Sequence, residues 1–288
     1  MKAKDALNAG MRRTVGYELR RAGSRRRPRG VGERLVAQPA FILCPTRSGS
    51  TLLRVLLDSH SQILSPQELH LRDIGVTIGS EYSARALKES RLDRRTMRFM
   101  LWDRILHREL EFSGKPLIVN KTPNDVLIAA DILECWPDAR FIFLLRHPGA
   151  IERSRAATRQ GDSPARNAKV IRMYGDALEM ARHQYPGLTV RYEELASEPE
   201  RVTRELCAFL GVPWEPGMID YGRFEHGRYR VGLGDWKDKI RSGNVQPPDP
   251  PPPVEEIHPS LLALCRAWGY LPPAEPAPVP QAVQRAAG

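Results

Sequence analysis

Three short runs of apolar residues constrain the fold of this chain more than any other feature. Residues 40–44, 117–119 and 141–145 contain only apolar side chains, which is typical of strands that are buried on both faces of a parallel sheet. A fourth strand is predicted over residues 188–192. Helical spacing of apolar residues predicts helices at 49–59, 91–112, 125–136, 165–184, 199–210 and 257–268, and another that opens at Pro148. The alternation predicts an α/β fold with a central parallel sheet flanked by helices in three layers.

Charge and proline content divide the 288-residue chain into three parts. The formal net charge is +10, and residues 1–30 account for +8 of it. We therefore predict a basic, flexible arm at 1–35, one α/β domain at 36–272 and a Pro/Ala-rich disordered tail at 273–288. The stretch 246–253 is rich in proline and is predicted to be an extended spacer.

The basic arm has two interpretations. One is a solvated tail, and the other is a segment that contacts an acidic membrane surface or nucleic acid. Tyr17 is its only aromatic residue, so stacking on bases is poorly supported and no nucleic-acid partner is predicted.

The composition excludes several classes of protein. Apolar residues make up 41% of the chain, and no apolar run approaches the ~18 residues of a membrane span. No secretory signal pattern is visible. The four cysteines lack metal-ligand spacing and are predicted to be reduced, mostly buried thiols. These features predict a cytoplasmic protein.

The turn after the first apolar run predicts a phosphate-binding loop. Residues 44–54 read Cys-Pro-Thr-Arg-Ser-Gly-Ser-Thr-Leu-Leu-Arg. A turn between a strand and a helix directs backbone N–H groups and the positive end of the helix at one point, which suits a phosphate. This P-loop-like segment is not a Walker A motif, because Gly49 is its only glycine and Arg47 supplies the cation. The alternative is a Ser/Thr-capped helix without a ligand.

Arg146 and Ser154 are the second signal of a ligand site. Arg146 directly follows residues 141–145, and Ser154 lies eight residues later in the next predicted helix. A guanidinium and a hydroxyl can hold one phosphate together, although a surface Arg and a helix Ser are the alternative. Ligands of parallel sheets bind beyond the carboxyl ends of the strands. We expect the groups that follow these ends to converge: Arg47, Lys121, Arg146 and Tyr192.

The order and spacing of these segments resemble the sulfotransferases that use 3′-phosphoadenosine 5′-phosphosulfate (PAPS). The branch most similar is that of the tyrosylprotein sulfotransferases and related bacterial enzymes. The resemblance covers roughly residues 38–272 and implies the sulfotransferase fold. The similar segments are Arg47-Ser48-Gly49-Ser50-Thr51-Leu52-Leu53-Arg54, Leu57-Asp58-Ser59-His60, Glu68, Asn120-Lys121-Thr122-Pro123, Val190-Arg191-Tyr192-Glu193-Glu194-Leu195 and Gly211-Val212-Pro213-Trp214.

This resemblance implies a role for each matching residue. Glu68 stands where the family has its general base, and a carboxylate can take the proton of an attacking hydroxyl. His70 is the alternative base. Arg47 and Lys121 would face the sulfuryl group and the bridging oxygen, where charge develops in the transition state. The nucleotide would be bound by Ser48, Gly49, Ser50, Thr51 and Leu52 at its 5′-phosphate, and by Arg146, Ser154 and Tyr192 at or near its 3′-phosphate.

Residues 228–237 resemble the glycine-containing loop that closes over the nucleotide in this family. The match is incomplete, because Asp235 stands where the tyrosylprotein enzymes have a Lys before the Trp, and Lys237 follows Trp236. This leaves three candidates for the cation that contacts the 3′-phosphate: Arg228, Arg230 and Lys237.

The resemblance implies a PAPS-dependent sulfotransferase that needs no metal. The expected acceptor is a hydroxyl of a small metabolite, a carbohydrate or a glycolipid, and a peptide tyrosine is less favoured because no export signal is visible. Two alternatives stay open. One is a P-loop-like kinase, against which the missing Gly-Lys-Ser/Thr counts. The other is a non-catalytic nucleotide-binding protein that docks on a membrane or nucleic acid through its basic arm.

Overall fold

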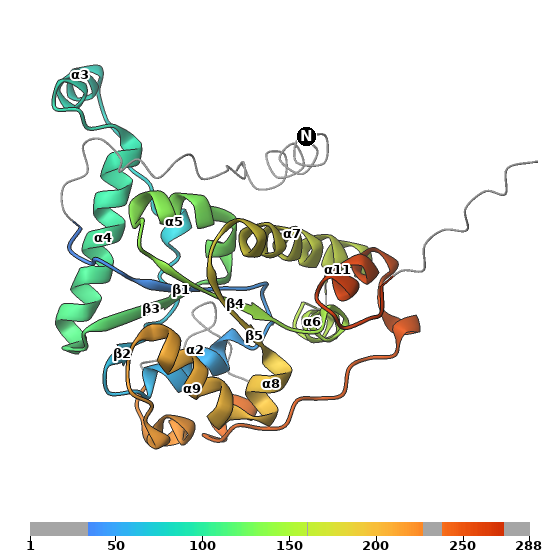
Figure 1. Cartoon of the computed structure of the whole chain (residues 1–288). Helices are drawn as coiled ribbons and strands as arrows, with labels where there is room; N and C mark the ends of the chain where they lie inside the picture. The colour runs from blue at the N-terminus through green and yellow to red at the C-terminus, as the bar shows by residue number, and fades with distance from the viewer. Residues whose placement is uncertain (1–33, 160, 227–237, 274–288) are drawn as a thin grey trace, which may run out of the picture.

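A five-stranded parallel sheet forms the centre of the computed structural model, which describes residues 34–159, 161–226 and 238–273 (Figure 1). The strands are β1 (Ala40–Leu43), β2 (Ile63–Leu64), β3 (Leu117–Lys121), β4 (Arg140–Leu145) and β5 (Gly187–Arg191), in the order β2-β3-β1-β4-β5. All four strand pairings are parallel. The carboxyl ends therefore lie at one edge of the sheet, as the sequence predicted.

The register brings the predicted site residues to this edge. Ile42 of β1 pairs with Lys121 at the end of β3. β4 also pairs with β5, and there Leu145 at the end of β4 lies opposite Arg191 at the end of β5. Arg146 and Tyr192 each follow one member of that last pair, so they leave the sheet side by side.

Helices cover both faces of the sheet, because alternate side chains of each strand point to opposite faces. Phe41 and Leu43 belong to a hydrophobic core beneath α4, α5 and α7. Ile42 and Cys44 belong to a second core beneath α2 and α9. In Figure 1, α5 and α7 lie above the sheet and α2 and α9 below it. This arrangement is the predicted three-layer α/β fold.

The α-helices are α2 (Ser50–Asp58), α3 (Glu81–Glu89), α4 (Arg94–Ser113), α5 (Ala129–Cys135), α6 (Pro148–Ala156), α7 (Pro164–Gln184), α8 (Tyr192–Ser197), α9 (Pro199–Leu210), α10 (Asp238–Arg241) and α11 (Leu262–Ala267). Short 3-10 helices occupy Leu71–Asp73, Pro123–Ile128, Pro216–Ile219, Tyr221–Arg223, Val254–Glu256 and Pro259–Leu261. The predicted helices at 49–59, 91–112, 165–184 and 199–210 are confirmed within a few residues, as is the helix that opens at Pro148.

Three sequence predictions need correction. Tyr192 does not end the last strand but begins α8. The helix predicted at 125–136 is a 3-10 helix, Pro123–Ile128, followed by the short α5. The helix predicted at 257–268 likewise divides into the 3-10 helix Pro259–Leu261 and α11. Both split helices begin beside a proline that lacks an N–H, which favours a tight first turn over a regular α-helical start.

The proline-rich stretch 246–253 is neither helix nor strand. It packs on α6, where the carbonyl of Pro250 accepts a hydrogen bond from Arg153 at 2.7 Å.

The four cysteines are unpaired and buried, which confirms the prediction of buried thiols. Within the described ranges, the helices are too short or too polar to span a membrane.

Candidate active site

The turn between β1 and α2 has the shape expected of an anion-binding loop. Arg47 and Gly49 both have positive φ values, 73° and 81°, so the chain turns sharply before α2 begins at Ser50. A Cβ on Gly49 would lie 2.2 Å from a ring carbon of Tyr192, so this position excludes any side chain. Ser48 is fully buried, and its hydroxyl has no hydrogen-bond partner within the described part of the chain. The turn thus places a buried donor and the start of a helix at one point, which suits an anion.

Arg146 packs against this turn together with Tyr192. Its NH1 group donates a hydrogen bond to the backbone oxygen of Arg47 at 2.9 Å. Its guanidinium carbon lies 4.3 Å from the centre of the Tyr192 ring, which is a cation–π distance. Its Nε is buried and has no partner among the residues the structure describes. Burial lowers the pKa of Arg146, but a guanidinium starts so high that it keeps its charge.

Ser154 lies in this cluster beside Arg47. In the structure, Nε of Arg47 donates to the hydroxyl of Ser154 at 3.1 Å. Ser154 therefore orients Arg47, whose backbone oxygen accepts from Arg146. The expectation that Arg146 and Ser154 hold one phosphate between them stays a prediction. The four residues Arg47, Arg146, Ser154 and Tyr192 nevertheless form one group beyond the ends of β1, β4 and β5.

Glu68 and Lys121 form the second half of the site. Nζ of Lys121 lies 2.5 Å from Oε1 of Glu68, and the exposed fractions of the two side chains are 1% and 13%. His70 is close, with Nε2 3.5 Å from the other oxygen of Glu68, but 35% of its side chain is exposed. The backbone N–H of His70 donates to Oγ1 of Thr122 at 3.3 Å, which ties this loop to the end of β3. A carboxylate and an ammonium in contact can take up a proton and stabilise negative charge at one place.

A buried amide–acid pair lies beneath Glu68 and Lys121. Nδ2 of Asn120 donates to Oδ2 of Asp125 at 2.7 Å, and both side chains are fully buried. Oδ1 of each of these side chains has no partner among the described residues. Burial, and next the negative charge of Glu68, raise the pKa of Asp125 well above its usual value. Asp125 therefore holds its proton more strongly than an ordinary carboxyl group does.

This pair gives a prediction about pH and stability. The raised pKa means that the folded protein keeps the proton of Asp125, whereas the unfolded chain loses it above about pH 4. Asp125 therefore stabilises the fold in acid, and this contribution falls as the pH rises, by up to about 1.4 kcal/mol per pH unit, until the folded group titrates. Because Asn at this position can keep the hydrogen bond to Asn120 without titrating, Asp125→Asn is expected to gain stability over the wild type as the pH rises from 5 to 8.

Urea unfolding at several pH values measures this difference. Asp138→Asn, at an exposed position between α5 and β4, is the control and should leave the pH dependence unchanged. Parallel curves for Asp125→Asn and the wild type would show that Asp125 is ionised in the folded protein.

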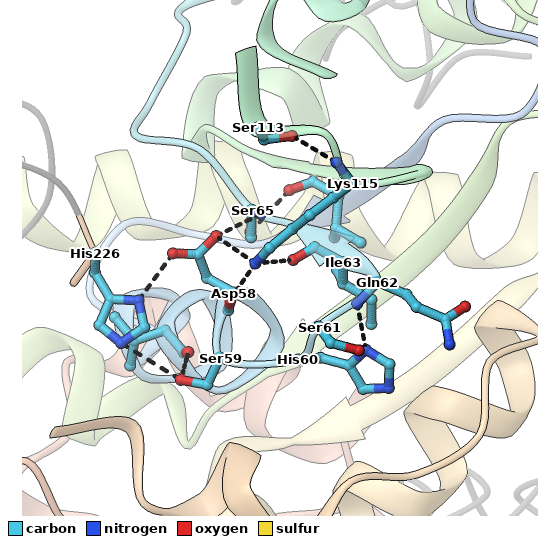
Figure 2. Close-up of polar contacts among 12 residues, drawn as sticks. Asp58, Ser59, His60, Ser61, Gln62, Ile63, Ser65, Ser113, Lys115 and His226 are labelled. Carbon is cyan, nitrogen blue, oxygen red and sulfur yellow. Dashed lines mark hydrogen bonds and ion pairs between the residues drawn. The ribbon is translucent and has the colours of Figure 1, made fainter. Parts of the chain in front are cut away.

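A polar network on the other side of α2 holds this helix in place (Figure 2). Asp58, at the end of α2, accepts hydrogen bonds from the backbone N–H of Ser65 at 2.9 Å and faces Nδ1 of His226 at 2.8 Å. Nζ of Lys115 donates to the backbone oxygens of Asp58 at 2.6 Å and Ile63 at 2.9 Å. The segment around Asp58 could be recognised in the sequence, but Lys115 and His226 could not, because they are distant in the chain and no motif marks them. The network fixes the end of α2 against the sheet and so supports the turn at its start.

Arg155 is another residue that sequence reasoning missed. It follows Ser154 in α6, is 8% exposed, and donates to Oγ1 of Thr46 at 2.9 Å. It also donates to Asn167 of α7 at 3.3 Å. The side chain therefore joins the first turn to two helices on the opposite side of the sheet from α2.

Three predicted nucleotide-binding residues, Arg228, Arg230 and Lys237, lie outside the described residues, so their assignment to the 3′-phosphate stays a prediction.

Within the described ranges, no three His, Cys, Asp or Glu side chains gather as a metal site would require. Burial raises the pKa of Cys44 to about 12, so the thiol behind the turn is neutral and is not a nucleophile.

Comparison with known protein families gives one match that spans more than half of the chain. The model of the sulfotransferase family matches residues 39–216. Protein-tyrosine sulfotransferase of Drosophila melanogaster is 27% identical over 205 residues, which are 64% of this chain and 40% of that protein. Nodulation protein NoeE of Sinorhizobium fredii is 26% identical over 224 residues, 66% of this chain and 53% of that protein. The chain thus spans about half, or less, of the length of these curated relatives.

Solved structures give the same fold. The sulfotransferase domain from the Synechococcus PCC 7002 olefin synthase has a TM-score of 0.62 and 22% identity, and the match covers 86% of this chain and 99% of that one. The sulfotransferase domain from the curacin biosynthetic pathway has a TM-score of 0.60 and 21% identity, with 84% and 100% covered. These likenesses concern the arrangement of the sheet and helices.

Proposed function

Because this chain belongs to the sulfotransferase family, we propose that it transfers a sulfuryl group from PAPS to the hydroxyl of an acceptor. The observation that carries the proposal is the position of three cations, Arg47, Lys121 and Arg146, around the carboxyl ends of neighbouring strands. Glu68, a carboxylate, lies directly beside one of them. Anion-binding groups next to a proton acceptor are what sulfuryl transfer to a hydroxyl requires.

Several observations support PAPS as the donor. The hydroxyl of Ser48 and Nε of Arg146 are buried donors without a partner among the described residues, and a phosphate oxygen would satisfy each. Gly49 lets the ring of Tyr192 pack directly against the turn before α2, which brings Tyr192 and Arg146 close to this turn. We assign the turn from Ser48 to Leu52 to the 5′-phosphate, and Arg146, Ser154 and Tyr192 to the 3′-phosphate. Ser154 also orients Arg47.

The reaction we propose forms a bond between the acceptor oxygen and sulfur while the bond from sulfur to the phosphate oxygen breaks. Glu68 accepts the proton of the acceptor hydroxyl. Lys121 and Arg47 stabilise the charge that appears on the leaving phosphate oxygen. The short contact between Lys121 and Glu68 keeps the base and the cation at the same spot, and the ammonium turns from the carboxylate to the leaving oxygen as charge develops there.

We propose that the acceptor is a hydroxyl of a small metabolite, a carbohydrate or a glycolipid, as the sequence suggested. A peptide tyrosine is the second class, and it is supported by the names of the protein-tyrosine sulfotransferases among the relatives. The cytoplasmic location and the membrane contact of the basic arm stay predictions from the sequence.

Two experiments separate this proposal from its alternatives. Transfer from labelled PAPS to acceptors of each class should proceed without Mg²⁺, whereas a kinase would use a nucleoside triphosphate and require Mg²⁺. Removal of residues 1–30 should leave transfer nearly unchanged, whereas it would abolish the function of a protein that acts only by docking through its arm. Absence of transfer from PAPS to every acceptor class, together with no binding of adenosine 3′,5′-bisphosphate, would overturn the proposal.

The nucleotide itself gives a further prediction. Adenosine 3′,5′-bisphosphate should bind much more tightly than AMP, because Arg146 is reserved for the 3′-phosphate. Loss of one charge-assisted contact costs on the order of 1.5–3 kcal/mol, so Arg146→Ala should weaken bisphosphate binding about tenfold or more and hardly change AMP binding. Calorimetry with both nucleotides measures the difference. An equal loss for the two nucleotides would remove Arg146 from the 3′-phosphate.

A further inference from the structure

Glu193 connects three segments that meet beside Arg146. Its Oε1 accepts a hydrogen bond from the backbone N–H of His147 at 3.0 Å. Its Oε2 accepts one from the hydroxyl of Tyr270 at 2.6 Å. The carboxylate belongs to α8, His147 follows β4, and Tyr270 follows α11. Glu193 is thus the point where the end of the sheet is joined to the last described segment of the chain.

The register of the sheet explains why a side chain is needed at this point. The pairing of β4 with β5 ends with Leu145 opposite Arg191. If β5 continued, residues 147 and 193 would be opposite each other, but α8 begins at Tyr192 and takes the backbone out of the sheet. The side chain of Glu193 accepts the N–H of His147 instead. This contact extends the connection between the two strands by two residues, and Arg146 and Tyr192 lie inside the extension.

The partner of Glu193 is itself held firmly. Burial, and next the charge of Glu193, raise the pKa of Tyr270, so its hydroxyl stays protonated and can donate. The Tyr270 ring lies under the guanidinium of Arg191 at 4.9 Å and against the ring of His147 at 5.0 Å. Glu193 is therefore fixed from both sides and can fix the chain that carries Arg146.

We propose that Glu193 is a positioning residue for the 3′-phosphate end of the nucleotide site, and that it acts through Arg146. The proposal rests on the proposed function, because it assumes that Arg146 binds the 3′-phosphate. Arg146 donates a hydrogen bond to the backbone oxygen of Arg47 and stacks on the ring of Tyr192. Both contacts depend on the position of the backbone at residues 146–147. Glu193 sets that course, and its charge also favours the charged form of Arg146.

Nucleotide binding by Glu193→Ala tests the proposal. The dissociation constant for adenosine 3′,5′-bisphosphate is expected to rise about tenfold, because a hydrogen bond to a charged group is lost, while that for AMP stays within twofold. The KM for PAPS should rise with little change in kcat. Glu193→Gln should recover most of the affinity, because its amide oxygen can still accept from His147. Glu198→Ala is the control, since this exposed carboxylate pairs with Arg201 at 2.6 Å and should affect neither nucleotide.

The double variant Glu193→Ala with Arg146→Ala shows whether Glu193 acts through Arg146. It should bind bisphosphate no more weakly than Arg146→Ala alone. If Glu193→Ala does not fold, Tyr270→Phe keeps the carboxylate and removes its donor, and a smaller selective loss of about threefold is expected. Equal weakening of AMP and bisphosphate, or additive losses in the double variant, would overturn the positioning role while leaving the proposed function intact. A wild type that binds AMP and bisphosphate equally would instead remove the assignment of Arg146 and the role of Glu193 with it.

Discussion

Glu68→Gln is expected to lower the turnover of sulfuryl transfer by roughly 10²–10⁴-fold and to leave nucleotide binding unchanged. The amide keeps the shape of the side chain and can still accept a hydrogen bond from Lys121, so the buried ammonium keeps a partner and the fold should persist. The amide cannot take the proton of the acceptor hydroxyl. Turnover with saturating PAPS, measured beside the affinity for adenosine 3′,5′-bisphosphate, separates the two effects.

His70→Ala is the control for this prediction. The imidazole is the alternative base and lies 3.5 Å from Glu68, but it is more exposed than Glu68 and sits at a backbone position with a positive φ of 49°. Its removal should cost much less turnover than Glu68→Gln. If His70→Ala is inactive and Glu68→Gln is active, the base is His70 and the role implied for Glu68 by the resemblance is wrong.

The sheet could be predicted because its inner strands are buried on both faces. β1, most of β3, and β4 are continuous apolar runs, and such runs are hard to place anywhere except in the middle of an α/β domain. β2 has only two residues, which is too short for any periodic signal. α3 buries no side chain, so its sequence has no apolar stripe from which a buried helix could be predicted.

The gathering of the site residues at one edge of the sheet could be predicted from the sequence, but their contacts could not. Residues of a motif can be recognised from their neighbours in the chain, as Arg47 and Gly49 can in the first turn. The contacts join residues far apart in sequence: Glu68 with Lys121, Arg47 with Ser154, and Glu193 with Tyr270. Only the register of the sheet and the packing of the helices decide these pairs. Ser154 illustrates the limit, because the sequence grouped it with Arg146 but gave no sign of its hydrogen bond with Arg47.

Lys121→Ala is expected to lower turnover by about 10²-fold or more while bisphosphate affinity changes only a few-fold. The bridging oxygen gains charge only as its bond to sulfur breaks, so the ammonium stabilises the transition state more than the bound product. Lys121→Met keeps the length of the side chain in a nearly inaccessible slot and is the better control for folding, since the side chain of Lys121 is 1% exposed.

Lys121→Arg should not restore full activity, although it keeps the charge. The planar guanidinium is larger than an ammonium, and a slot filled by one Nζ in contact with Glu68 leaves no room for the fork without displacing the base. Because base and cation touch, their losses should also fail to add: Glu68→Gln with Lys121→Ala should be little slower than the slower single variant. Single-turnover sulfation measured beside bisphosphate binding checks both statements. Wild-type turnover in Lys121→Ala would place Lys121 outside the reacting centre and leave Arg47 as the cation that faces the leaving oxygen.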